Sequence, residues 1–249
     1  MSKGTIIITG ASAGLGAEMA RRFAALGYDL GLGARRGERL AALREEITAA
    51  HPDRRVVLRV LDVTDGEAVS TAFTEIAAEL GTVDRVIVNA GLGRGAAIGT
   101  GRPDVNRRTA LTNFVGALAQ TEAAMEIFRA QGHGHLVMIS SMSALRGMRR
   151  AMTVYAATKA GVSALAEGLR SENVPGVDVS VIHPGYIRTE MNEHVAHRTR
   201  FMVDLDVGVR SMVTAIEKRR VKAYVPAWPW VPIGFLLERL PLSVVRRLT

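Results

Sequence analysis

The chain has 249 residues, 48% of them apolar, and no cysteine, so it can bury a substantial core and has neither disulfides nor thiolate metal sites. Its net charge of +8 comes from basic residues scattered along the whole chain, without a basic stripe that alternates with aromatic residues, which argues against nucleic-acid binding. No signal-peptide pattern precedes the first apolar run, and we expect a cytoplasmic protein of one domain.

Apolar runs and helical patterns alternate along the chain at intervals of roughly 25 to 30 residues, which is typical of βα units. The expected strands lie at about 4–9, 28–33, 55–60, 83–89, 134–140, 177–183 and 222–225. The expected helices lie at about 14–26, 37–50, 66–80, 105–130, 153–172 and 205–219. This pattern predicts an α/β fold with a parallel sheet.

The first expected strand ends in a glycine-rich turn, Gly10-Ala-Ser-Ala-Gly14-Leu-Gly16, and an amphipathic helix follows directly. Glycines in such a turn let the backbone approach a pyrophosphate, and the amides at the helix N-terminus then face the anion. Glycines also simply end strands, so the turn alone is weak support for a dinucleotide. The strand before it and the helix after it favour cofactor binding.

The second expected strand is followed by Ala34-Arg35-Arg36. An acidic residue at this place binds the adenine ribose diol of NAD, whereas arginine accommodates the 2′-phosphate of NADP. The alternative is that both arginines are solvated residues at the start of the next helix. We infer NADP(H), with Arg35 as the first candidate for the phosphate and Arg36 as the second.

Two further strand ends carry residues suited to the cofactor. Asp62, followed by Val63, lies at the carboxyl end of the third strand, where ligands of open α/β sheets bind, and we expect it to meet the adenine amino group. The small residues of Asn89-Ala90-Gly91 leave room for a ribose. Asn89 is also expected to lock the turn between adjacent strands.

Two patterns concern the helices. Thr64, followed three residues later by Glu67, forms a capping box, with Asp65 as a helix-start residue. Asn113 lies among apolar neighbours inside the long helix expected at 105–130. A buried asparagine in a helix is usually structural and often bends the helix. The second interpretation is that Asn113 holds a water next to Lys159.

Tyr155 and Lys159 stand four residues apart in a helical run and therefore share one face of the helix. A neighbouring cation favours the phenolate and lowers the pKa of a tyrosine. Ser141, at the end of the strand at 134–140, can share a carbonyl oxygen with the phenol. Taken alone, the Tyr/Lys spacing is best explained by a surface pair, but together with Ser141 it favours a proton-transfer site.

Over about residues 4–190 the sequence resembles the classical short-chain dehydrogenases/reductases. Six motifs follow the order of that family: Thr9-Gly10-x-x-x-Gly14-x-Gly16, Asn89-Ala90-Gly91, Asn113, Ser141, Tyr155-x-x-x-Lys159 and Pro184-Gly185-x-x-x-Thr189. The resemblance implies a single-domain Rossmann fold, with a three-layer, doubly wound, seven-stranded parallel sheet. It also implies a nicotinamide cofactor, a small carbonyl or alcohol substrate, and a homodimer or homotetramer built through the two long helices.

The same resemblance assigns the catalytic roles. Tyr155 is expected to be the general acid in carbonyl reduction and the base in alcohol oxidation, and Lys159 to hold the nicotinamide ribose and lower the pKa of Tyr155. Ser141 is expected to polarise the carbonyl, and Asn113 to keep a water in a proton relay. The remaining motif residues are expected to line the cofactor: Gly10, Ser12, Gly14, Leu15, Gly16, Asp62, Val63, Asn89, Ala90, Gly91, Pro184, Gly185, Ile187 and Thr189.

One spacing departs from the family pattern. Ser141 precedes Tyr155 by fourteen residues, whereas the family most often has thirteen. The pattern at the strand end favours Ser141, with one residue inserted in the loop that follows. Ser140 and Ser143 remain alternatives.

Four segments without a diagnostic motif are expected to enclose the substrate: the loops at 92–104 and 142–152, the cover at 190–204, and the apolar and basic tail at 223–249. His194 and His197 in the cover lack a further ligand at metal spacing, so we expect no metal. His133 and His135, at the start of a strand, are expected to face solvent.

The tail begins with an uncharged stretch, Ala223 to Leu237, which is too short and too interrupted by proline to span a bilayer. We expect it to pack over the substrate pocket or against a neighbouring subunit. The alternative is peripheral membrane contact, with Trp228 and Trp230 at the interface and Arg246 and Arg247 near anionic headgroups.

These features predict an NADP(H)-dependent oxidoreductase that transfers a hydride between nicotinamide and the carbonyl or alcohol of an apolar substrate. One alternative is the reductase component of a two-step epimerase, because Arg149-Arg150-Ala151 and the tail resemble those of short-chain reductases acting on lipid-linked sugars. The other is a non-catalytic NADP-binding redox sensor, although such a protein has no physical need for all four catalytic residues.

Overall fold

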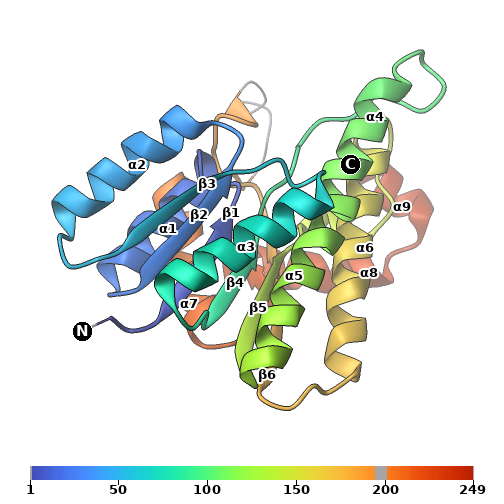
Figure 1. The fold of residues 1–249 in the computed structure, drawn as a ribbon. Helices are drawn as coiled ribbons and strands as arrows, with labels where there is room; N and C mark the ends of the chain where they lie inside the picture. Colours follow the sequence, from blue (N-terminus) through green and yellow to red (C-terminus); the bar gives the residue numbers. More distant parts are fainter. Residues whose placement is uncertain (1, 194–200, 249) are drawn as a thin grey trace.

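A computed structural model describes residues 2–193 and 201–248 of the chain (Figure 1). Seven parallel strands form one sheet in the order β3-β2-β1-β4-β5-β6-β7. The strands are β1 (Thr5–Thr9), β2 (Asp29–Ala34), β3 (Val56–Val60), β4 (Arg85–Val88), β5 (Gly134–Ile139), β6 (Val177–Pro184) and β7 (Lys222–Val225). The chain builds outward from β1 in one direction and then from β4 in the other, so the predicted doubly wound topology is confirmed.

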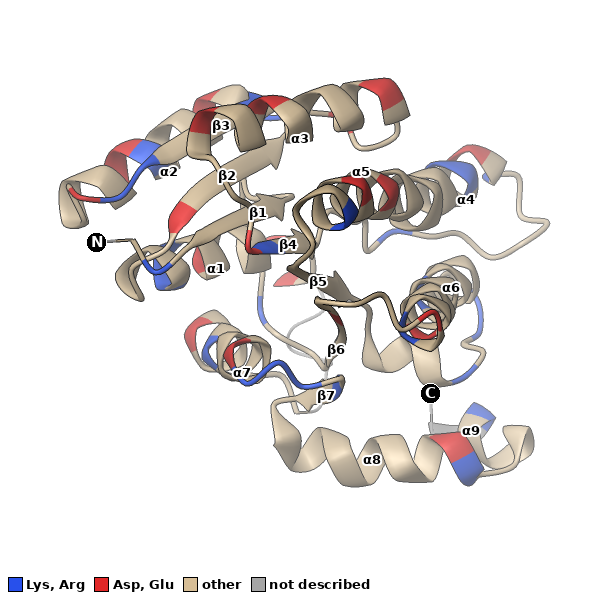
Figure 2. Ribbon diagram, turned by 60° about the horizontal axis from the view of Figure 1, so that its bottom comes forward, with Lys and Arg blue, Asp and Glu red and all other residues tan. Residues whose placement is uncertain are grey.

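Helices cover both faces of the sheet (Figure 2). On one face lie α1 (Gly14–Ala25), α2 (Gly37–Ala50) and α7 (Leu205–Glu217), and on the other lie α3 (Gly66–Leu80), α5 (Gly116–Gln131) and α6 (Met152–Ser171). Shorter elements complete the chain: α4 (Pro103–Ala110), the π-helical segment η1 (Leu111–Val115), the 3₁₀ segment η2 (Met142–Leu145), α8 (Ala227–Arg239) and α9 (Leu242–Leu248).

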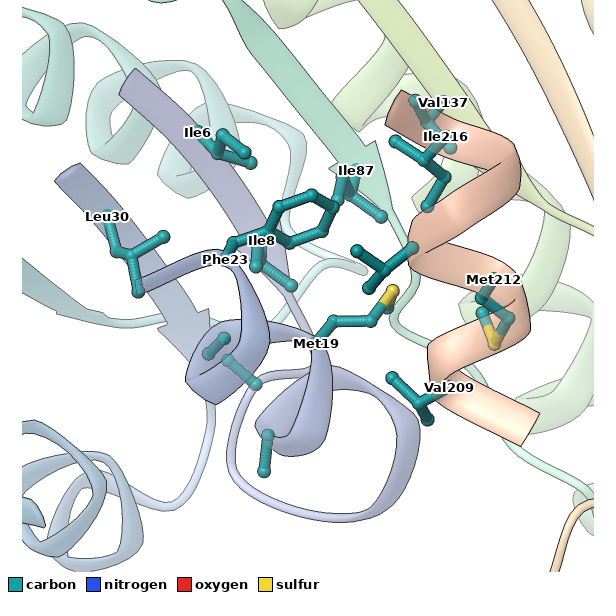
Figure 3. Close-up of a cluster of buried hydrophobic side chains, with 14 of the residues drawn as sticks. Ile6, Ile8, Met19, Phe23, Leu30, Ile87, Val137, Val209, Met212 and Ile216 are labelled. Atoms are coloured by element: carbon teal, nitrogen blue, oxygen red, sulfur yellow. The ribbon is translucent and has the colours of Figure 1, made fainter. Parts of the chain in front are cut away.

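The central strands are buried on both sides, which explains their continuous apolar runs. In β1, Ile6 and Ile8 point toward α1 and α7 and meet Met19 and Phe23 (Figure 3). Ile7, between them in sequence, belongs to the core under α3 and α5. This alternation follows from the period of two in a strand and gives the sheet two separate apolar cores.

The helix expected at 105–130 is not continuous. It is divided into α4 and α5 by the π-helical turn at Leu111–Val115, which contains the buried Asn113. The Asn113 side chain bonds the backbone of Leu92 in both directions: its Oδ1 accepts from the Leu92 amide at 2.7 Å and its Nδ2 donates to the Leu92 carbonyl at 2.9 Å. The expectation that Asn113 disturbs its helix is confirmed, and π-turns of this kind are frequent at functional sites.

The start of α3 differs from the capping box predicted at Thr64. The Thr64 hydroxyl donates to Asp62 Oδ1 at 2.9 Å, so it is engaged with the preceding turn. Asp65 is the N-cap, and its carboxylate accepts from the Ala68 amide at 3.0 Å. The prediction was one residue too early because two adjacent residues each carry a side chain able to cap.

His135 does not face solvent, contrary to the prediction. Its strand is fully buried, Arg85 Nε donates to His135 Nδ1 at 3.0 Å, and Ser180 Oγ lies 2.8 Å from Nε2. Burial, together with the Arg85 charge, lowers the pKa of His135 to about 3, which keeps the ring neutral. Glu217 balances Arg85 through an ion pair of 2.7 Å, so a satisfied polar network lies at the amino ends of the strands.

The tail forms two helices that the proline-rich sequence did not predict. In α8 the buried residues Trp230 and Gly234 face the protein, and a Cβ added to Gly234 would come within 3.3 Å of Tyr224, Met142 and Leu145. Arg146 donates to the Leu240 carbonyl at 3.0 Å, which joins the segment between α8 and α9 to the loop after η2. The tail therefore packs over η2 and the loop that follows it, the segment that precedes Tyr155.

Candidate active site

In the turn between β1 and α1, backbone segments pack so closely that side chains larger than glycine do not fit. Gly10 and Gly14 have φ values of +65° and +53°, in the left-handed region that favours glycine. A Cβ on Gly16 would lie 2.4 Å from the Gly10 carbonyl oxygen, so this position accepts no larger side chain without moving the turn. Thr189, from the segment after β6, lies against Gly14.

The N-terminus of α1 has no side-chain cap. Its N-cap residue is Ala13, and the first turn contains no acidic residue. By contrast, α3 at the same edge of the sheet is capped by Asp65. The first amides of α1 are therefore left for a partner outside the described chain, and an anion such as a pyrophosphate satisfies them best.

Thr9 and Asn89 join the ends of β1 and β4. Asn89 Nδ2 donates to the Thr9 carbonyl at 2.8 Å, while the amides of Asn89 and Ala90 donate to Thr9 Oγ1, each at 3.1 Å. The prediction that Asn89 locks the turn between adjacent strands is confirmed. These bonds keep the small residues Ala90 and Gly91 at the sheet edge.

The two arginines after β2 lie at the same edge in different settings. Arg35 is 57% exposed at its side chain, with its nearest carboxylate, that of Asp62, 3.8 Å away. Arg36 Nε donates to Ser12 Oγ in the glycine turn at 3.1 Å, and Glu190 lies 3.9 Å from its guanidinium. Although burial alone would raise it, the pKa of Asp62 is lowered by two hydrogen bonds from Thr64 and by the Arg35 charge.

Lys159 and Asn113 meet on either side of Gly91. A Cβ on Gly91 would lie 3.3 Å from Asn113 Oδ1 and 3.5 Å from Lys159 Nζ. The Lys159 ammonium donates to the Ile139 carbonyl at 2.8 Å. Burial lowers the pKa of Lys159 to about 8. The buried cation is thus fixed to the end of β5, beside the glycine that follows β4.

Ser141 is the serine that contacts Tyr155. It follows β5, its hydroxyl lowers the pKa of the Tyr155 phenol, and it accepts from the Ser143 amide at 3.1 Å. Ser140 instead donates to the Lys159 carbonyl at 2.9 Å and lies 2.8 Å from the Ser163 hydroxyl, so its side chain is engaged with α6. Of the three serines left open by the spacing, the geometry favours Ser141.

The pKa of Tyr155 is raised in this structure, not lowered by Lys159 as predicted. Burial is the main cause, the Ser141 hydrogen bond opposes it, and the neighbouring Tyr186 adds to it. The Lys159 ammonium donates to the Ile139 carbonyl rather than to the phenol, which explains why its charge does not offset the burial. Four-residue spacing puts two side chains on one helix face but does not determine where their ends point.

Several residues predicted to line the cofactor direct their side chains into the apolar cores. The side chains of Val63 and Ile187 are 6% and 3% exposed and belong to the two apolar cores, and Leu15 packs against one of them. Thr189 remains at the turn, where its amide donates to Asn192 Oδ1 at 2.9 Å.

An aromatic group beside Tyr155 was missed at the sequence level. Trp230 of α8 stacks edge to face with Tyr186 at 5.6 Å and with Phe201 at 6.4 Å between ring centroids. The indole also covers Gly185, where an added Cβ would lie 2.0 Å from the ring. The position of Tyr186 directly after Pro184-Gly185 was the one signal available, whereas the contact with α8 depends on the tertiary fold.

Part of the predicted substrate cover can be located. Met191 lies against the loop at 92–104, because a Cβ on Gly93 would be 2.5 Å from its sulfur. His194 and His197 lie outside the described residues. Among the residues that the structure does describe, no group of three or more His, Asp or Glu side chains could hold a metal ion.

Comparison with known proteins agrees with this geometry. A family model described as short chain dehydrogenase matches residues 4–200. An uncharacterized oxidoreductase of Mycobacterium tuberculosis is 46% identical over 243 residues, which cover 97% of this chain and 96% of the relative. A short-chain dehydrogenase from Sphingobium yanoikuyae in complex with NADPH has a TM-score of 0.81 at 25% identity, with 96% of this chain and 97% of that one covered.

A second solved structure shows the same fold. The short chain dehydrogenase/reductase from Burkholderia phymatum, in complex with NAD, has a TM-score of 0.84 at 21% identity and covers 99% of this chain and 95% of its own. Together the family match, the close relative, the sheet order and the arrangement of Ser141, Tyr155 and Lys159 lead to one conclusion. The chain belongs to the short-chain dehydrogenase/reductase family of oxidoreductases.

Proposed function

We propose that this protein is an NADP(H)-dependent carbonyl reductase in which Tyr155 donates the proton. The observation that carries the proposal is that Ser141 and Tyr155 interact at the sheet edge where the glycine turn and the buried Lys159 also lie. The family membership supports an oxidoreductase, and the solved relatives above bind either NADPH or NAD.

The residues of the turn fit a dinucleotide. The uncapped amides of α1 favour a pyrophosphate, and the close approach of Gly10 and Gly16 leaves the backbone accessible. Thr189, which lies against Gly14, would bound the same space. When bound, the nicotinamide supplies the hydride for reduction.

The arginines support NADP(H) over NAD(H). No acidic residue follows β2, where a ribose diol would need one, and the Arg35 guanidinium is exposed and only loosely paired with Asp62. Arg36 is held at Ser12, so its charge lies next to the glycine turn. We assign the 2′-phosphate to Arg35 first and to Arg36 second, since Glu190 partly neutralises Arg36.

The protonation states are compatible with reduction. A phenol with a raised pKa is protonated at neutral pH and can give its proton to the oxygen of a carbonyl substrate. Ser141, bonded to the same phenol, would donate to that oxygen and polarise the carbonyl. With its pKa at about 8, Lys159 remains largely protonated at neutral pH and can bind ribose hydroxyls as well as the Ile139 carbonyl.

Asn113 would act through its position. Its amide already holds Leu92, so the side chain fixes the loop after Gly91. The π-turn that contains Asn113 interrupts the regular pattern of helix hydrogen bonds, and a backbone carbonyl released in this way can hold a water beside Lys159. Such a water would return a proton to the phenol after each turnover.

We propose an apolar substrate and a homo-oligomer. Tyr186, Phe201 and Trp230 form an aromatic wall beside Tyr155. Four apolar side chains of η1 and the start of α5 are exposed, Leu111, Phe114, Val115 and Leu118, which supports contact between subunits through the long helices. The cytoplasmic location stays a prediction.

Calorimetric titration with NADPH and NADH tests the cofactor. We expect NADPH to bind more tightly, and Arg35→Ala to weaken NADPH at least about tenfold while leaving NADH nearly unchanged, because the arginine would contact only the 2′-phosphate. Arg44→Ala, at an exposed arginine of α2, is the matched control. Equal losses for both nucleotides would contradict the assignment.

A panel of apolar ketones and aldehydes tests the reaction. We expect NADPH consumption with at least one of them. If NADPH binds and no carbonyl is reduced, the reductase proposal fails and a sensing role is favoured.

A further inference from the structure

The tail presents an apolar surface to solvent. Its members, which we call the α8–α9 face, are Trp228, Val231, Phe235, Leu236, Leu242 and Val244, and their exposed fractions are 78%, 48%, 55%, 52%, 61% and 38%. Isolated exposed apolar residues are normal, but six large ones on two consecutive short helices need an explanation.

The fold itself does not need these side chains. The opposite side of α8 already provides the contact with the protein, through Trp230 and Gly234. Figure 2 shows α8 along the outer edge of the molecule, beyond β7. Apart from Glu238 and Arg239 at its end, α8 has no charged residue on any side. A surface helix that is apolar on both its inner and outer faces is suited to contact with a second apolar phase.

Basic side chains border the patch. The guanidinium of Arg239 lies over the Phe235 ring, 3.7 Å from its centroid. Arg149 and Arg246 line a recess of about 310 Å³ between the loop at 147–149 and α9, together with Met148, Leu242 and Val245. Within the described part of the chain, none of these three arginines forms an ion pair with a carboxylate. The recess therefore combines an apolar floor with two arginines for which the described residues provide no carboxylate.

We propose that the α8–α9 face docks on an anionic lipid surface. The apolar side chains would enter the boundary between headgroups and acyl chains, Trp228 would lie at the interface, and the arginines would meet acidic headgroups. No helix in the described residues is long and apolar enough to cross a membrane, so the contact would be peripheral.

Charge complementarity favours a lipid surface over a second copy of the chain. A twofold contact through this face would place an arginine-bearing surface against the same arginine-bearing surface, without carboxylates to balance them. Acidic headgroups remove this repulsion. Lys222 and Tyr224 already occupy Glu238, the one acidic residue of the tail.

Docking would have a consequence for substrate access. Arg146 ties the loop before Tyr155 to the Leu240 carbonyl, and Trp230 of α8 lies beside Tyr186 near the phenol. The membrane-facing helix therefore also forms a wall of the candidate site, and an amphiphilic substrate could pass from the lipid surface to that wall. This consequence rests on the proposed function, whereas docking itself does not.

Co-sedimentation with vesicles tests the docking. The full-length protein is mixed with vesicles of phosphatidylcholine alone or with about one-third phosphatidylglycerol, at low and high salt. We expect binding to the anionic vesicles that weakens as salt increases. Phe235→Ser combined with Leu236→Ser should reduce binding at least about tenfold, because two half-exposed apolar side chains no longer enter the lipid.

Matched variants separate specific from general effects. Leu26→Ser combined with Val207→Ser removes apolar side chains of similar exposure, 44% and 50%, from other elements and should not change binding. Arg149→Glu with Arg246→Glu should abolish the preference for anionic vesicles, whereas Arg44→Glu on α2 should leave it intact.

Three results would overturn the proposal. The first is no binding of the wild-type chain to anionic vesicles, and the second is equal vesicle binding by the wild type and the Phe235/Leu236 variant. The third is that this variant loses self-association in sedimentation without lipid while its vesicle binding is unchanged. Neither cofactor nor turnover enters the measurement. A failure here therefore leaves the reductase proposal untouched, and a failure of the carbonyl panel leaves docking untouched.

Discussion

Replacing Lys159 by methionine should make the folded protein more stable at neutral pH. Lys159 is 6% exposed, and its ammonium has one described partner in the structure, the Ile139 carbonyl. Methionine has a similar length and carries no charge. The substitution therefore removes a buried cation while it fills most of the same space.

The magnitude follows from the shift in pKa. Burial lowers the pKa of Lys159 from 10.5 to about 8, so at about 1.4 kcal/mol per unit the ammonium costs the fold about 3 kcal/mol at neutral pH. Loss of the donor to the Ile139 carbonyl would cost about 1 kcal/mol. The expected net gain in the free energy of unfolding is about 2 kcal/mol at pH 7.

The gain must depend on pH in a defined direction. Below pH 8 Lys159 is protonated in both folded and unfolded chains, and the wild type bears the full penalty. Between pH 8 and pH 10.5 the folded state releases its proton first, so wild-type stability rises and the difference from Lys159→Met shrinks.

Urea denaturation at equal protein concentration, at pH 7 and at about pH 10, measures both effects. Lys218→Met, at an exposed lysine, is the control and should change the free energy of unfolding by less than about 0.5 kcal/mol at either pH. A destabilised Lys159→Met variant at pH 7, or a difference that does not change with pH, would refute the reasoning.

Two further predictions concern the start of helices. Gly16→Ala should weaken NADPH binding at least about tenfold in calorimetry, because its Cβ would lie 2.4 Å from the Gly10 carbonyl oxygen. The control, Gly168→Ala at an open position of α6, should leave NADPH affinity unchanged and raise the free energy of unfolding by about 0.5–1 kcal/mol. Equal NADPH affinities of the two variants would contradict the close approach at Gly16. Asp65→Ala should cost about 1 kcal/mol in denaturant unfolding as the N-cap of α3, and clearly more than Thr64→Ala; the reverse order would restore the capping box.

Most of the sheet could be predicted from the sequence because its strands are buried on both faces. Ile6-Ile7-Ile8 and the similar runs that follow have no polar interruption, and each is separated from the next by a helical pattern. The candidate site was predictable for the same reason: its residues lie at the carboxyl ends of the strands, where turns of glycine and small residues mark the chain.

The errors share a cause, which is that side-chain partners from distant segments are invisible in a linear pattern. His135 looked like a solvent-facing residue because Arg85 and Ser180, its partners, come from neighbouring strands. Likewise, the direction of the Lys159 ammonium is determined by the Ile139 carbonyl at the end of β5. The predicted decrease in the pKa of Tyr155 was wrong because the Lys159 ammonium bonds this carbonyl and not the phenol.

The tail illustrates a different difficulty. Pro226, Pro229 and Pro232 suggested an irregular segment, yet α8 begins within them and continues to Arg239. Trp228 has non-helical backbone angles, so Pro229 lies in the first regular turn, where its missing amide would have no partner in any case, whereas Pro232 lies inside the helix. The helix is stabilised instead by Trp230 against Tyr186 and Gly185, contacts that no local propensity could reveal.

The role of Tyr155 as proton donor is tested most directly by Tyr155→Phe, with NADPH affinity from calorimetry and turnover from NADPH consumption on a carbonyl that the wild type reduces. We expect NADPH to bind within about twofold of the wild type, and turnover to fall by at least about a hundredfold because the transferred proton is lost. Turnover within about tenfold of the wild type would show that another group supplies the proton and would contradict the proposed function.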